Sequence, residues 1–190
     1  MSSSSLVRFG GGLASAAAGI LLLLGHVLNL GGDPEYGTVP GASSVLVAHI
    51  ILVVALVALY AAQADESGLL GSLGMVLGVI GTTLVSGAEV DALFAAGVSG
   101  MLSVLGGLAF FIGLILFGIA TMRAGVFPRW AGLLLIVGDI VFGAGDFTRS
   151  AAPVVFVVGA LITCAGFVWL GVALLSGRSG VSSQQPGRVS

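Results

Sequence analysis

SVLVAHIILVVALVALYAA, residues 44–62, carries no carboxylate, lysine or arginine and a single histidine, His49. As an α-helix rising 1.5 Å per residue it would be about 28 Å long, close to the roughly 30 Å hydrocarbon core of a bilayer. Comparable apolar runs recur along the 190-residue chain, which is 57% hydrophobic and 7% charged with a mean hydropathy of +1.20. Soluble domains carry about 25% charged residues. The sequence therefore predicts an all-α, multi-pass membrane protein and excludes a soluble globular domain.

The apolar runs and the breakers between them predict one bundle of six transmembrane helices. The segments between the runs are rich in Gly, Pro and charged residues, which are typical of turns. We expect a single membrane domain over residues 9–176 and disordered tails at 1–8 and 177–190. A signal peptide is not expected, because the only Ala-x-Ala-like tripeptide precedes the first apolar run instead of following it. The expected helices are residues 9–30, 44–62, 69–88, 98–122, 128–147 and 153–175.

The arginines predict the orientation in the membrane. If the N-terminus is cytoplasmic, five arginines fall on the cytoplasmic side and Arg149 alone falls outside, as the positive-inside rule requires. Both termini should then be cytoplasmic, in the cell (cytoplasmic) membrane, with Trp130 anchored at the interface. A net charge of −2 without any lysine excludes a nucleic-acid-binding surface. The five cytoplasmic arginines are Arg8, Arg123, Arg129, Arg178 and Arg188.

With this orientation, the polar side chains gather in the outer half of the expected bundle. We expect them to line a polar pocket formed by the first, second, third and fifth helices. Asp139 lies deepest, where a charge costs about 2.5 to 3.5 kcal/mol, so it must be protonated, paired or hydrated. Its candidate partners are His26, His49 and Arg149, unless Gly143 and Gly145 end the helix early and bring Asp139 closer to water. The candidate pocket residues are His26, His49, Glu89, Asp91, Asp139 and Asp146.

Three classes of function remain open on these residues. The first is a non-enzymatic binding, sensing or accessory protein that uses the pocket. The second is a redox or metal-dependent membrane protein, in which His26, His49 and Glu89 bind Zn or Fe, or the two histidines ligate a haem. The third is a purely structural partner of a larger membrane complex. Taken singly, Glu89, Asp91 and Asp146 are also consistent with helix caps or solvated loop charges.

Glycines recur at helical spacing in the third and fourth expected helices, including the G-x-x-x-G of Gly74 and Gly78. Small residues allow close helix approach. They therefore favour packing within the chain, and they leave open a homo-oligomer or a membrane-protein partner that docks on these two helices.

The segment LFGIATMRAGVFPRWAGLLLIVG, residues 116–138, resembles a recurrent segment of small six-helix membrane proteins of unknown function from bacteria and archaea. In that family a helix ends in an R-A-G-V-F-P-R-W-A-G turn, matched here by residues 123–132, and a histidine opens the second helix, matched by His49. The likeness extends loosely over residues 10–175. It implies the six-span fold and no particular activity, and Asp139 departs from the aliphatic residues usual at its position.

Overall fold

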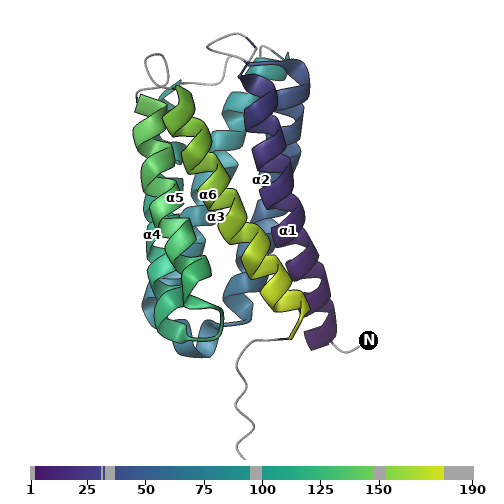
Figure 1. Cartoon of the computed structure of the whole chain (residues 1–190), viewed down its shortest axis with the longest axis vertical. Coiled ribbons are helices and arrows are strands. Elements are labelled where there is room, and N and C mark those ends of the chain that lie inside the picture. The colour runs from purple at the N-terminus through teal and green to yellow at the C-terminus, as the bar shows by residue number, and fades with distance from the viewer. Residues whose placement is uncertain (1–2, 31, 33–36, 95–99, 148–152, 178–190) are drawn as a thin grey trace, which may run out of the picture.

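The computed structural model describes residues 3–30, 32, 37–94, 100–147 and 153–177. These residues form six α-helices that run alternately up and down, so that Ser3 and Leu175 lie at the same end of the bundle, drawn as the lower end (Figure 1). The all-α fold and the six helices predicted from the sequence are confirmed. The helices are α1 (Ser3–Asn29), α2 (Val39–Ala61), α3 (Ala64–Phe94), α4 (Gly100–Ala124), α5 (Arg129–Phe147) and α6 (Pro153–Leu175).

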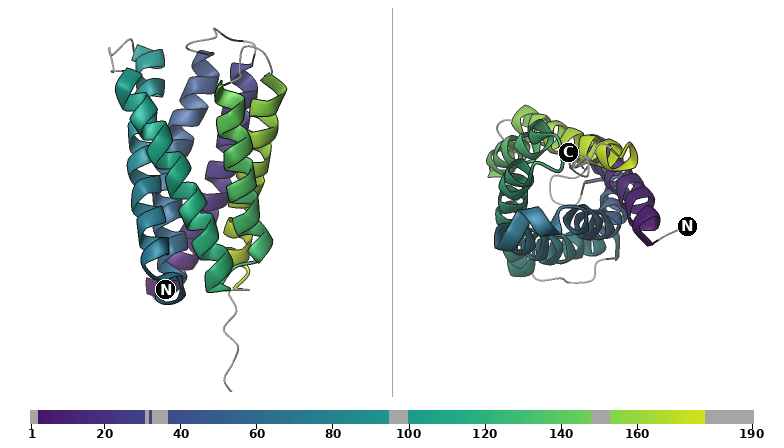
Figure 2. Two further views of the ribbon diagram at one scale, coloured as in Figure 1. Left: turned by 90° about the vertical axis from the view of Figure 1, so that its left-hand side faces the viewer. Right: turned by 90° about the horizontal axis from the view of Figure 1, so that it is seen from below.

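The six helices form a closed ring in chain order. Each helix packs mainly against the helix before it and the helix after it, and α6 packs back against α1 (Figure 2). The contacts within the hairpins α1–α2, α3–α4 and α5–α6 are more extensive than those between hairpins. The bundle is therefore three helical hairpins joined side by side.

Five of the helices, α1, α2, α3, α4 and α6, are long and apolar enough to cross a membrane, which indicates a membrane protein. The helix outside this set, α5, carries Arg129, Asp139 and Asp146 within its 19 residues. Large apolar side chains are exposed on the outside of the ring, as expected of a surface in contact with lipid. Val54 of α2, Val104 of α4 and Val172 of α6 are 56%, 64% and 52% exposed.

α1 and α2 both begin earlier than the sequence predicted. The start of α2 is Val39 and not residue 44, because Thr38 caps it: the Thr38 side chain accepts a hydrogen bond of 3.0 Å from the Gly41 N–H, and Pro40 suits a first helical turn. The start of α1 is Ser3, inside the segment 1–8 that we expected to be disordered, since serine is favourable at a helix start. Of the tail expected at 177–190, all but Gly177 lies outside the described residues.

α3 also differs from the expected helix at both ends. It begins at Ala64 but breaks at Gly68, whose φ of 57° and ψ of −154° are not helical and are readily adopted only by glycine. At its other end it continues to Phe94, so Glu89 and Asp91 lie within the helix and do not terminate it. The expected start of the fourth helix at residue 98 lies outside the described residues.

The apolar core occupies the lower and central parts of the ring. Large side chains there are almost completely buried and come from α2, α4, α5 and α6. The upper part instead contains polar interior residues, so the ring packs differently at its two ends. The core includes Leu52, Leu56, Leu59, Leu114, Phe117, Leu135, Phe167 and Leu170.

Glycines bring the α3 and α4 backbones into direct contact. A Cβ at Gly81 would collide with the backbone of Phe110, and a Cβ at Gly113 would collide with that of Gly78. Gly74 likewise faces the backbone of Phe117. The glycines of the G-x-x-x-G motif thus pack within the chain. The homo-oligomer predicted through the third and fourth helices stays a prediction, and it would have to use other residues of these helices.

The substitution Gly81→Ala should destabilise the bundle by about 1 to 3 kcal/mol, because the added methyl group forces α3 and α4 apart. Gly107→Ala is the matched control on α4, since a Cβ there meets nothing within 4 Å. Replacing this helical glycine should stabilise by about 0.5 to 1 kcal/mol. Thermal unfolding of the purified protein in detergent measures both effects, and equal shifts in the two variants would contradict the assigned packing.

Candidate polar site in the upper half of the bundle

The pair formed by His49 and Glu89 joins α2 to α3 inside the ring. His49 Nδ1 lies 3.8 Å from Glu89 Oε2, and the two side chains are only 7% and 16% exposed. Neither atom has a hydrogen-bond partner among the described residues. Two groups that can carry opposite charges therefore lie within ion-pair distance in a largely water-excluded place, without the hydrogen bonds that normally offset burial.

His26 of α1 contacts aromatic rings of α5 and α6. Its ring centroid is 5.2 Å from that of Phe142 in α5 and 5.1 Å from that of Phe156 in α6. The two phenyl rings are themselves 4.6 Å apart. Phe142 and Phe156 are absent from the candidate residues predicted from the sequence, although each lies near the same end of two consecutive expected helices.

Two consecutive phenylalanines of α4 show that His26 and His49 lie at a similar height in the bundle. The Phe110 ring centroid lies 6.3 Å from that of His49, and a Cβ at Gly143 would lie 3.1 Å from Phe111. Gly143 follows Phe142, the neighbour of His26, so both histidines lie at about the same height. Asp139 is four residues below Gly143, or about 6 Å deeper.

Asp139 is buried in the ring, with 1% of its surface exposed. Its Oδ2 has no hydrogen-bond partner within the described segments. α5 continues to Phe147, so the early helix end considered for Gly143 and Gly145 is wrong; Gly145 instead allows the α6 backbone at Phe156 to come close.

Two of the three expected partners of Asp139 contact other residues, and the third is not described. His49 lies against Glu89, His26 lies against the two phenyl rings, and Arg149 lies outside the described residues. Thr163 of α6 packs against the neighbouring Gly138, and its buried Oγ1 also lacks a partner among the described residues. Asp139 is therefore a buried carboxyl group with unused hydrogen-bonding capacity.

The other two candidate carboxylates lie near the upper end of the ring. Asp146 is exposed in the last turn of α5, and Asp91 is partly exposed near the end of α3. Of the six residues proposed for the pocket, the structure brings His49 and Glu89 within ion-pair distance of each other.

This geometry gives little support to a metal or haem site. Among the described residues, no three His, Cys, Asp or Glu side chains are grouped closely enough to hold a metal ion. Zinc and iron sites commonly use three or four such ligands. A haem held by both histidines would have to enter where Phe142 and Phe156 now pack against His26.

A second polar cluster, absent from the sequence predictions, lies near the lower end. Gln63 is fully buried, and its Nε2 donates a 3.0 Å hydrogen bond to Thr121 Oγ1, which ties the α2–α3 turn to α4. Arg123, Arg129 and Trp130 are exposed at the same end, as expected of residues at a membrane interface.

Comparisons of the chain with models of known protein families, with curated proteins and with solved structures found no match. The resemblance of residues 116–138 to a family of six-helix membrane proteins accordingly stays an expectation from the sequence. The candidate site has to be interpreted from its own geometry.

Replacing Asp139 by leucine should raise the thermal stability of the protein. A buried polar group without a partner costs about 1 to 3 kcal/mol, and an apolar side chain of similar shape removes that cost. The control is Asp146→Leu in the exposed last turn of the same helix, for which we expect a change within about 0.5 kcal/mol. Unfolding in detergent measures both, and a clear loss of stability in Asp139→Leu would show that this carboxyl group is satisfied in the fold.

Proposed function

We propose that the chain is a six-span protein of the cytoplasmic membrane with both termini in the cytoplasm. α5 is the sixth span, because it runs the full height of the ring between α4 and α6 (Figure 1). Arg8, Arg123 and Arg129 lie at the lower end, whereas Asp91 and Asp146 lie near the upper end. The positive-inside rule then makes the lower end cytoplasmic and the upper end external.

In this proposal the protein is a non-enzymatic binding, sensing or accessory protein, and the upper interior of the ring is its binding site. The observation that carries the proposal is the burial of His49, Glu89 and Asp139 in one half of the ring, each with a polar atom that has no hydrogen-bond partner among the described residues. Ionisable groups inside a membrane bundle are costly, and they generally mark a ligand or proton site.

The acceptor atoms that have no hydrogen-bond partner among the described residues indicate the chemistry of the ligand. Glu89 Oε2 and Asp139 Oδ2 accept hydrogen bonds, and each carboxylate attracts positive charge. The ligand that complements them is therefore a small hydrogen-bond donor or cation, of which the proton is the smallest. Burial of both carboxyl groups favours a compact ligand over an extended one.

A thermal-shift panel of alkali cations, ammonium, methylammonium and guanidinium, each at several pH values, tests this site. A ligand at about ten times its Kd adds roughly 1.4 kcal/mol to the stability of the folded state, which is a rise of a few degrees in Tm. We expect one cation, or acidification itself, to stabilise the wild type. The same shift should be lost in Glu89→Gln and Asp139→Asn and retained in the exposed control Asp146→Asn. An identical response in all four proteins, or no response in the wild type, would contradict the proposed site.

Sided labelling tests the orientation. Asp146→Cys and Asp65→Cys place exposed thiols at opposite ends of the ring, while the native Cys164 is buried. In intact cells a membrane-impermeant maleimide should label Asp146→Cys, and it should label Asp65→Cys only after permeabilisation. The reverse pattern would overturn the orientation without affecting the interior geometry.

A further inference from the structure

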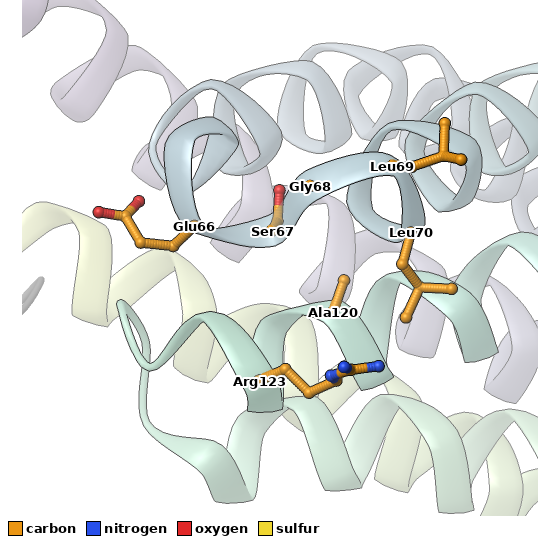
Figure 3. Close-up of a pocket in the computed structure, with 7 residues that line it drawn as sticks. All are labelled: Glu66, Ser67, Gly68, Leu69, Leu70, Ala120 and Arg123. Carbon is orange, nitrogen blue, oxygen red and sulfur yellow. The ribbon is translucent and has the colours of Figure 1, made fainter.

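A pocket of about 330 Å³ lies between the lower ends of α3 and α4, at the break in α3 (Figure 3). Ser67, Gly68 and Leu70 contribute from α3, and Ala120 and Arg123 contribute from α4. The break at Gly68 separates the first turn of α3 from the rest of the helix, and it lies directly at the pocket. This pocket is far from the polar site, at the opposite end of the ring.

Arg123 places a positive charge at the pocket. The side chain is exposed, and it forms no ion pair or hydrogen bond within the described part of the chain. Glu66 also borders the pocket, but its carboxylate points away from Arg123 (Figure 3). The guanidinium group is therefore available to an anion, and its planar set of donors matches a phosphate group well.

The leucine side of the pocket, formed by Leu69 and Leu70, continues onto the apolar outside of the ring. Leu69 is 75% exposed beside the pocket, and Leu73 and Val76 are 46% and 45% exposed farther along the same helix. A ligand that extends from Arg123 along α3 would thus meet a cation first and then an apolar surface that faces lipid. An anionic phospholipid has this sequence of chemistry, a phosphate followed by acyl chains, whereas a soluble phosphate would leave the apolar part unused.

We propose that the pocket binds the phosphate headgroup of an anionic phospholipid, with Arg123 as the recognising residue and the outer face of α3 in contact with an acyl chain. This site is independent of the proposed function of the upper half of the ring. It needs only that α3 and α4 cross the membrane, as their length and composition indicate. A basic pocket between transmembrane helices at the cytoplasmic face is a recurrent way to hold anionic lipid.

Native mass spectrometry of the full chain in detergent tests the proposal, with titration of phosphatidylglycerol and phosphatidylcholine. We expect the wild type to retain phosphatidylglycerol more tightly than phosphatidylcholine. Arg123→Gln should weaken phosphatidylglycerol binding about fivefold, the effect of losing one basic residue near an anionic surface. The matched control is Arg8→Gln, which removes the same charge from an exposed position at the same end, on α1. This control should bind as the wild type does.

Three results would overturn the proposal. Unchanged phosphatidylglycerol binding in Arg123→Gln would exclude the pocket as the binding site. An equal loss of binding in Arg8→Gln would show that the effect comes from net charge and not from the pocket. Displacement of the retained lipid by inorganic phosphate alone would assign the pocket to a soluble anion. Thermal unfolding of both variants shows that each is folded, so a loss of binding reports on the site.

Discussion

Direct contact between the backbones of neighbouring helices is the interaction on which the ring depends. In a membrane the hydrophobic effect does not drive helices together, so stability comes from close packing and from hydrogen bonds. Glycine makes such packing available at the α3–α4 contact through Gly81 and Gly113, and at the α5–α6 contact through Gly138 and Gly159, whose added Cβ atoms would all collide with a neighbouring backbone. These contacts fix how far α3 slides past α4 and α5 past α6, and so help to set the heights of Glu89 and Asp139.

The two halves of the ring interior differ in a way that packing alone does not require. Large apolar side chains such as Leu56, Phe117 and Phe167 make up most of the lower half, where the buried polar side chains Gln63 and Thr121 are hydrogen-bonded to each other. In the upper half, Glu89 and Asp139 occupy interior positions where a leucine would be cheaper. A bundle that served only as a scaffold would gain stability by extending its apolar core upward. Under the proposed function, the free-energy cost of burying these carboxyl groups is what the protein accepts in order to bind a ligand there.

The fold could be predicted from the sequence because each helix is a long apolar run bounded by strong breakers, and α6 even matches its predicted limits, Pro153–Leu175. The predictions are wrong where the structure depends on a contact between two helices. The sequence predicted that the third helix ends before Glu89, because a carboxylate usually lies outside a membrane span. In the structure α3 continues to Phe94, and Glu89 lies within ion-pair distance of His49 from α2. The same limit applies to the site. The need of Asp139 for a partner could be predicted from its depth, whereas the phenyl rings around His26 depend on helix rotations that no single segment specifies.

The arrangement of the ring as three hairpins has a consequence for assembly. Contacts within a hairpin link residues close in sequence and can form early, whereas the contacts between hairpins require separate units to meet. His49 belongs to the first hairpin, Glu89 to the second and Asp139 to the third. No single hairpin contains the site. Each delivers its own ionisable residue to the bilayer, so the polar interior is completed only when the last gap in the ring closes.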